Sequence, residues 1–342
     1  MVHGRRVGLF LSTEGEGQDR RIKLHQDGRS GRAREHLAVT LPRTVLSSTN
    51  ALESPTALLA RREMQSWRLL QLEPSSLRDS DSFSDPTHIS ADGAHLAATL
   101  QRLARREVGN GAGRSPHAPA VFVRAANRLS SLVEDVREIR VDEDRQRELL
   151  TLQVVDQERN LHAARALSDG TLRFLALAIL ENDPDAQGLL CFEEPENGIH
   201  PQRIGSMLKI LKDLCVNTEE AIGDENPMRQ VIVNTHSPAV VGLVDDDDLL
   251  IAEPHEAVAA GGRCRAVAFR WLGDTWRSKG WSDIPTVSRG ALIAYLNPFA
   301  GDEASEGESS NTTTGKLPRK PRRVKDRKDL NMLLGFMNDM PE

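Results

Sequence analysis

The stretch Gly188-Leu-Leu-Cys-Phe-Glu-Glu-Pro-Glu-Asn-Gly198 decides the fold of this 342-residue chain. It opens with an apolar run bounded by polar turns, which is typical of a short strand buried in a parallel sheet. The run ends in Glu193 and Glu194, and open α/β sheets bind ligands at the carboxyl ends of their strands. Since neighbouring side chains of a strand point to opposite faces, one carboxylate can reach a metal ion while the other faces a water molecule. The alternative is a solvated acidic turn, to which Glu196 adds a third negative charge.

A second strand of the same kind is predicted over Val231–Asn234. It is followed by Thr235-His236-Ser237-Pro238, in which the Ser-Pro pair is a typical start of a helix. His236 would then lie at the same sheet edge as the two glutamates. A single histidine at a strand end is otherwise usually a hydrogen-bonded surface residue, so its significance depends on the motifs around it.

Ahead of both strands, Leu167-Ser168-Asp169-Gly170-Thr171 leads into an apolar helix predicted over Leu172–Ile179. A serine and a glycine at a helix N-terminus offer a hydroxyl and free backbone N–H groups to an anion, and the helix dipole favours negative charge there. The alternative is that Ser168 and Asp169 only cap the helix.

The order of elements predicts the fold class. From Leu167 to Glu253 helices and strands alternate, which favours an α/β fold with a parallel sheet flanked by helices. The region before it is expected to be mixed α+β. Its expected elements are strands at Val7–Leu11 and His36–Leu41, a helix from Pro55 to Met64, an extended segment Trp67–Leu72, helices at 94–106 and 118–136, and strands Val136–Val141 and Leu149–Val155.

Composition excludes several classes of protein. Apolar residues make up 39% of the chain, an ordinary share for a globular protein. No run approaches the ~20 apolar residues that span a bilayer, so we expect no membrane partner. Three cysteines without a CxxC pair favour a reduced, cytoplasmic chain over a disulfide framework or a zinc site. A net charge of −6 means that any contact with DNA must be local.

Three motifs in this order, LSDGT, LLCFEEPENGIHP and VIVNTHSP, resemble the ATP-binding-cassette-type ATPases of the RecF/SMC branch. They are most similar to the stand-alone bacterial predicted AAA-family ATPases related to RecF. The resemblance is strong over residues 165–252 and weaker back to about Pro42. It implies a P-loop NTPase fold of the ABC/RecF type, with ATP and Mg²⁺ as cofactors.

The resemblance implies a role for each motif residue. Glu193 falls on the Walker B carboxylate that holds Mg²⁺, and Glu194 on the residue that polarises the attacking water. His236 falls on the switch histidine that senses the γ-phosphate. These implied roles agree with phosphoryl-transfer chemistry, which needs positioning, a metal ion and a water-orienting group.

The other implied roles concern a second protomer. Ser168, Asp169 and Gly170 fall on the signature motif, which in the family contacts the γ-phosphate of ATP held by the opposite protomer. Asn197–His200 fall on the D-loop that links the two sites of the dimer, and Asn197 is expected among the nucleotide-binding residues. The family thus implies a head-to-tail homodimer that sandwiches ATP.

One expected motif is absent from the sequence. The Walker A pattern G-x-x-x-x-G-K-[ST] does not occur, and the Gly315-Lys316 pair is followed by Leu317 in a charged tail. We therefore expect this chain to correspond to the C-terminal two-thirds of such an ATPase. The alternative function is a catalytically incomplete fragment or subunit that donates its signature motif to the ATP site of a P-loop-bearing partner chain.

The expected organisation has three parts. Residues 1–160 would be a remnant of the first lobe with a helical and β insertion, residues 161–300 the ATPase lobe, and residues 301–342 a disordered charged tail with a possible short helix at Leu330–Met337. The resemblance further implies a role in DNA repair or in defence against mobile DNA, with DNA and an associated nuclease as possible partners.

Overall fold

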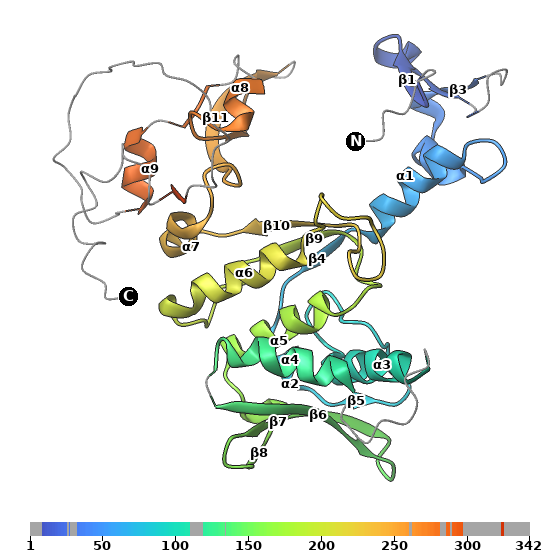
Figure 1. Ribbon diagram of the computed structural model, residues 1–342. Helices are drawn as coiled ribbons and strands as arrows, with labels where there is room; N and C mark the ends of the chain where they lie inside the picture. The colour runs from blue at the N-terminus through green and yellow to red at the C-terminus, as the bar shows by residue number, and fades with distance from the viewer. Residues whose placement is uncertain are drawn as a thin grey trace.

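A three-stranded parallel sheet lies at the centre of the molecule (Figure 1). In it β9 (Gly188–Glu193) pairs with β10 (Arg229–Asn234) on one side and with β4 (Arg68–Leu70) on the other. The two predicted strands and the extended segment before them are thereby confirmed. The computed structural model describes residues 9–25, 27, 33–109, 119–133, 135–259, 262–280, 285–287, 289–296 and 323–324.

Two helices cover one face of this sheet. Figure 1 shows α5 (Asp169–Glu181) and α6 (Ile204–Leu214) on the same side of β9 and β10. α5 is buried on almost every side: Leu172 and all residues of Phe174–Leu180 are buried, as expected of a helix that is apolar around its whole circumference. It is the predicted apolar helix, extended by two residues at its C-terminus.

A second layered unit packs against the other side of α5 (Figure 1). Its antiparallel sheet has the order β5-β7-β6, with β8 paired to β7. The strands are β5 (Asp81–Ser82), β6 (Val136–Asp144), β7 (Leu149–Asp156) and β8 (Leu161–Ala163). The helices of this unit are α2 (Pro74–Arg78), α3 (Leu96–Gly109) and α4 (Ala120–Ser130). Both units share one apolar core that extends along the chain from Leu70 to Val240.

The predicted helix 118–136 is too long. α4 ends at Ser130, where the backbone N–H of Ser131 donates to the carbonyls of Arg128 and Leu129 and closes the last turn. The chain then turns, and Val136 begins β6. Of the apolar residues at the end of the expected helix, Leu132 and Val133 lie in the connection after α4, and Val136 belongs to β6, which pairs with β7 along nearly its whole length.

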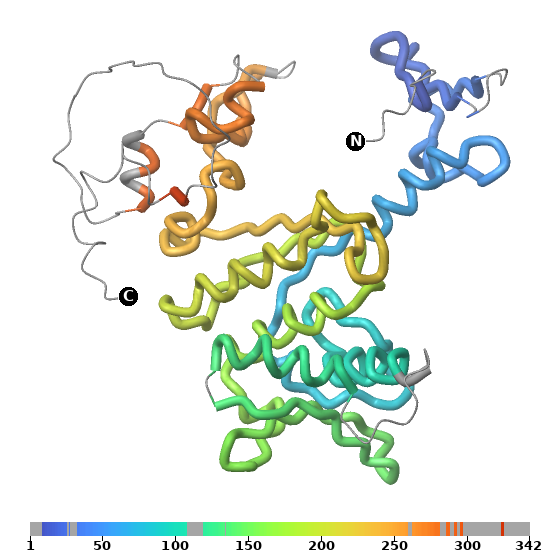
Figure 2. The backbone as a smooth tube through the Cα atoms, in the orientation of Figure 1, coloured from blue at the N-terminus to red at the C-terminus, as the bar shows by residue number. Residues whose placement is uncertain are grey.

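Two short regions flank the core, as the tube in Figure 2 makes clear. Ahead of it lie β1 (Leu11–Glu14), β2 (Arg21–Leu24), β3 (Arg34–Leu37) and α1 (Pro55–Ser66). The strand expected at His36–Leu41 is wrong beyond Leu37, since residues 38–40 form a 3₁₀ turn. Only the last residue of the strand expected at Val7–Leu11 lies in β1, and residues 7–8 are outside the described chain. The strand β2 was not predicted, because charged residues interrupt its short apolar pattern.

Beyond the core the alternation of helix and parallel strand ends. α7 (Pro238–Leu243) is followed by β11 (Ile251–Ala259) and β12 (Gly262–Arg270), which form an antiparallel hairpin apart from the central sheet. The expectation that the third strand of the alternation joins the parallel sheet is therefore wrong. α8 (Trp276–Gly280) and α9 (Arg289–Leu296) follow. Of residues 301–342 only Arg323 and Val324 are described, so the expected tail and its short helix lie outside the described residues.

The second face of the parallel sheet carries exposed apolar side chains. Strand register places Leu69, Cys191 and Ile232 in one row across the three strands. Leu69 is 61% exposed and Ile232 is 55% exposed. Parallel sheets are normally covered on both faces. Within the described residues this sheet is covered by helices on one face, and β10 is an edge strand.

Arg229, at the start of β10, closes the C-terminal end of α5. It is 3% exposed, and its guanidinium donates to the carbonyl oxygens of Leu180 at 3.0 Å and of Glu181 and Asp183 at 3.3 Å. The carbonyls of Leu180 and Asp183 also accept backbone N–H groups, from Asp183 at 3.2 Å and from Ala186 at 3.1 Å, so the guanidinium adds charged donors to carbonyl groups at and just beyond the end of the helix.

We predict that Arg229→Met destabilises the fold by about 2–3 kcal/mol, because the buried carbonyls lose charged donors while the apolar stem is kept. Urea denaturation of the full chain measures this change. Arg147→Met, at an exposed turn position, is the control and should change the free energy of unfolding by less than about 0.5 kcal/mol. Equal effects of the two substitutions would contradict this role for Arg229.

Candidate functional site

The parallel pairing of β9 and β10 brings two polar loops to one edge of the sheet. Glu193 is in register with Asn234, the last residue of β10. One step further, the backbone N–H of Glu194 donates to the carbonyl of Asn234 at 2.8 Å. The loops that follow the two strands therefore start side by side.

Glu194 contacts both loops. Its carboxylate accepts a hydrogen bond from the Asn197 side-chain amide at 2.7 Å, and its Oε1 lies 2.5 Å from Nδ1 of His236. The backbone of Glu194 is left-handed, with φ of +44°, so the strand alternation stops here and the side chain turns toward His236. Sequence reasoning predicted that these residues share a site; the structure brings all three together.

Hydrogen bonding keeps Glu194 ionised. The Asn197 amide lowers the pKa of this carboxyl most. Burial opposes it as the next largest effect, and the interactions with His236 and Arg173 lower the pKa further, so that the net shift is downward. The side chain is therefore a hydrogen-bond acceptor at neutral pH. A carboxylate in this state can orient a water molecule.

Glu193 is placed differently. It is exposed at the end of β9 and makes no ion pair or side-chain hydrogen bond with the described residues. Two amide side chains that were given no role from the sequence lie on the same edge: Asn234 is its register partner, and Gln71 comes directly after the Leu70–Phe192 pair of β4. Carboxylate and amide oxygens are hard ligands of the kind that suits Mg²⁺. The strand register, which the sequence did not provide, was the missing signal.

The N-terminus of α5 lies against the same loop. Ser168 is its N-cap and accepts a hydrogen bond from the Thr171 N–H at 3.2 Å, so the predicted capping role is real. Asp169 forms an ion pair with Arg78. A Cβ at Gly170 would lie 2.2 Å from the carbonyl oxygen of Gly198, so glycine is needed for this close approach.

A further contact ties α5 to the loop after β9. Arg173 donates from Nη1 to the carbonyl of Asn197 at 2.5 Å and from Nε to the carbonyl of Leu72 at 3.0 Å. The first turns of α5, the end of β4 and the loop after β9 are thus held as one unit. Ser168 itself remains exposed at the molecular surface.

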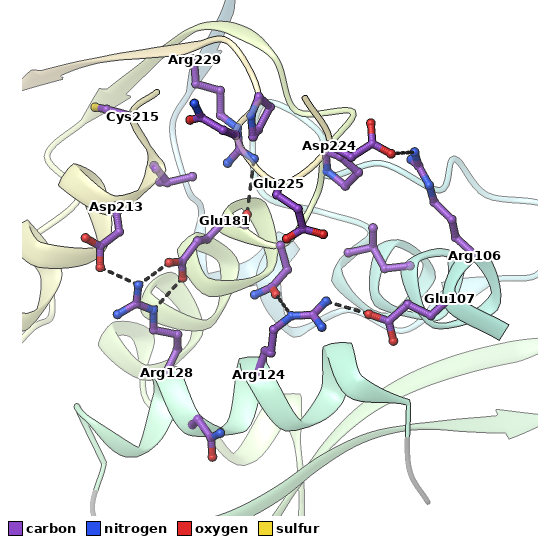
Figure 3. A pocket seen from close by; sticks show the side chains of 17 residues that line it. Arg106, Glu107, Arg124, Arg128, Glu181, Asp213, Cys215, Asp224, Glu225 and Arg229 are labelled. Carbon is purple, nitrogen blue, oxygen red and sulfur yellow. Dashed lines mark hydrogen bonds and ion pairs between the residues drawn. The ribbon is translucent and has the colours of Figure 1, made fainter. Parts of the chain in front are cut away.

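A pocket of about 730 Å³ lies elsewhere, at the C-terminal end of α5 (Figure 3). Two of its arginines pair with acidic side chains: Arg124 pairs with Glu107 at 2.7 Å, and Arg128 pairs with Glu181 and with Asp213. Arg229, which also lines the pocket, donates to backbone carbonyls. The lining of this pocket thus includes side chains that form ion pairs with one another. The pocket lies at the opposite end of α5 from Ser168 and does not include the predicted site residues.

The parallel sheet, the helices packed on it and the carboxylates where its strands end agree with the P-loop-NTPase type of α/β fold, the class of the AAA-type ATP-binding ATPases to which the family comparison assigns the chain. Within this class, residues 15–242 match the family described as "AAA domain, putative AbiEii toxin, Type IV TA system". The match covers more than half of the chain, and the chain belongs to this family.

Solved structures with some similarity include SMC ATPases. One is 12% identical, with a TM-score of 0.29 over 44% of this chain and 83% of that one. It comes from work on the structural biochemistry of ATP-driven dimerization and DNA-stimulated activation of SMC ATPases. The Smc head domain of Pyrococcus yayanosii is 12% identical, with a TM-score of 0.27 over 45% and 27%. The ScpA-bound Smc head of Pyrococcus furiosus is 10% identical, with a TM-score of 0.27 over 44% and 34%.

No curated protein matches this chain. Among the described helices, none combines the length and apolar character needed to cross a membrane.

The lowered pKa of Glu194 predicts a pH dependence of stability. Because the folded state favours the ionised carboxylate, its contribution is fully present above the usual glutamate value of 4.5 and is lost as pH falls through the lower, folded-state pKa. We expect Glu194→Gln to lose less stability than the wild type on acidification below pH 4.5. Urea denaturation at a series of pH values measures this, with Glu138→Gln on the exposed side of β6 as the control.

The contact between Gly170 and Gly198 predicts a cost for any side chain at position 170. Gly170→Ala should destabilise the protein by about 2 kcal/mol, because the helix N-terminus must move away from the loop. Gly205→Ala in α6 is the matched control: its Cβ meets no atom within 4 Å, so a neutral or slightly stabilising effect is expected there. Thermal denaturation of the two variants measures the difference. Equal shifts of their melting temperatures would contradict the proposed packing constraint at Gly170.

Proposed function

We propose that this chain binds and hydrolyses ATP at a composite site formed by a head-to-tail dimer. One observation carries the proposal: the ionised Glu194 contacts Asn197 and His236 at the sheet edge where Glu193 is free to bind a cation. Family membership supports the ATPase class, and the arrangement of side chains supports the assignment of roles.

Each role follows from the chemistry of the side chain. Glu193, with help from the amide oxygens beside it, would hold Mg²⁺, and the metal ion would neutralise charge on the phosphates. Glu194 accepts a hydrogen bond from the attacking water and orients it. His236, bound to Glu194 through one ring nitrogen, has its other nitrogen available for the γ-phosphate.

The dimer supplies the remaining contacts. Ser168 is exposed at the N-terminus of α5, where the helix dipole favours an anion, and Asp169, Gly170 and Asn197 lie around it. In the proposed dimer these residues face the γ-phosphate of ATP held by the partner. Closure of the dimer would thus complete the site.

The proposed biological role is DNA repair or defence against mobile DNA, in the cytoplasm and with DNA and a nuclease as partners. It rests on the resemblance of the three motifs to the RecF/SMC branch and on the description of the matched family as a putative toxin domain. The three-part organisation at 1–160, 161–300 and 301–342 belongs to the same proposal.

A second candidate function is a subunit that donates its signature motif to an ATP site built by a P-loop-bearing partner chain. The apolar row of Leu69, Cys191 and Ile232, in which Leu69 and Ile232 are exposed, favours it, because an uncovered face of a parallel sheet is suited to a partner. The absence of a Walker A pattern from the sequence agrees with it. Under this alternative, the chain alone binds MgATP poorly.

A mixing experiment tests the composite site. We expect the purified chain to hydrolyse ATP at a rate that is second order in protein at low concentration. Ser168→Arg and Glu194→Gln should each be inactive, because each removes one half of every site. A one-to-one mixture should regain about a quarter of the wild-type turnover, since half of the dimers are then mixed and each contains one intact site.

The outcomes separate the two candidate functions. Turnover that is first order in protein, or a mixture as inactive as its parts, would contradict the head-to-tail dimer. If the wild-type chain is inactive alone and regains turnover on addition of a P-loop-bearing chain, the subunit function is supported, provided that Ser168→Arg abolishes the gain.

A further inference from the structure

Glu196 is a buried carboxylate to which the proposed reaction assigns no role. It lies in the loop after β9, two residues beyond Glu194, and is 7% exposed. Its Oε1 accepts a hydrogen bond from the hydroxyl of Thr235, whereas its Oε2 is buried without a partner among the described residues. Burying a carboxylate with one oxygen unsatisfied costs free energy, so the arrangement calls for an explanation beyond packing.

Thr235 belongs to the other loop. It lies between the end of β10 and His236, and its hydroxyl makes two hydrogen bonds: it donates to Glu196 and accepts from the backbone N–H of Ser237 at 3.0 Å. One half-buried hydroxyl therefore joins the loop after β9 to the loop after β10. The joint is one residue away from His236 and two residues away from Glu194.

The contact between His236 and Glu194 needs such support. The His236 side chain is 78% exposed. Among the described residues, the imidazole ring is held by its 2.5 Å contact with Glu194 alone. Exposed pairs of this kind are weak, because water competes and side-chain entropy opposes them. A contact that must be held in one geometry therefore depends on how firmly the two backbones are fixed.

We infer that Thr235 and Glu196 are positioning residues that hold the ring of His236 against the carboxylate of Glu194. The hydrogen bond between the half-buried Thr235 and the buried Glu196 fixes the separation of the two loops, and the exposed pair then forms without having to order the loops itself. The catalytic meaning of this inference rests on the proposed function, whereas the geometric statement does not.

The hydrogen-bond state of the His236 ring tests the inference. A contact with Glu194 through Nδ1 places the proton of the neutral ring on Nδ1, and ¹⁵N NMR of the imidazole nitrogens reports which nitrogen carries it. We expect the full-length wild type at pH 8 to show this Nδ1–H signature for His236, assigned by its loss in His236→Gln. Thr235→Val should lose the signature, and Thr235→Ser, which keeps the hydroxyl, should restore it.

A matched control separates positioning from stability. Thr99 is fully buried, and its hydroxyl, like that of Thr235, donates a hydrogen bond: it binds the carbonyl of His95 at 2.6 Å, remote in sequence from both loops. Thr99→Val should lower the melting temperature and leave the His236 signature intact. Glu196→Leu should behave like Thr235→Val, whereas Glu196→Gln, which retains an acceptor oxygen for Thr235, should keep the signature.

Two results would overturn the inference: an unchanged His236 signature in Thr235→Val, or no recovery in Thr235→Ser. The measurement needs no nucleotide. A chain that fails to hydrolyse ATP but shows the expected NMR series would therefore contradict the proposed function alone.

Discussion

The candidate site depends on the parallel register of β9 and β10. Because Glu193 pairs with Asn234, the two strands end together, and the loops that follow them begin at a fixed separation. The contact between Glu194 and His236, the hydrogen bond from the Asn197 amide and the hydrogen bond between Thr235 and Glu196 all follow from this pairing. A shift of one residue in register would reverse which strand side chains are buried, so the core that β9 shares with α5 also fixes the chemistry at its end.

α5 connects this edge to the rest of the molecule. Its N-terminus is held by the approach of Gly170 to Gly198 and by Arg173, and its C-terminus by Arg229. Between these ends it is buried on every side. A helix fixed at both ends cannot adjust when its first turn is disturbed, so the exposed Ser168 is presented on a rigid support. This rigidity is what a surface that contacts a second protomer requires.

Much of this arrangement could be predicted from the sequence. Short apolar runs ending in polar residues identified β9 and β10, and an apolar run after a capping serine identified α5. Local pattern could not place the end of α4 or separate β11 from the parallel sheet, because both depend on which strands pair: β6 pairs with β7, and β11 pairs with β12 and not with β10. The resemblance of the motifs to a known family placed Glu194 and His236 in one site. The sequence pattern did not show that Gln71 follows β4 at the same edge of the sheet, because that depends on the pairing of β4 with β9. The burial of Glu196, in a loop of high charge, was not predicted from its residue type, since acidic residues are rarely buried.

The most direct test of the account is whether this sheet edge holds the metal of MgATP. Isothermal titration calorimetry of the full chain with MgATP, over a range of protein concentrations, provides it. The account predicts micromolar binding that strengthens as the chain dimerises, a large loss of affinity in Glu193→Gln, and unchanged affinity in the control Glu138→Gln. Binding that is unaffected by Glu193→Gln, or no binding by the dimeric chain, would contradict the proposal that Glu193 and its neighbours form an ATP site.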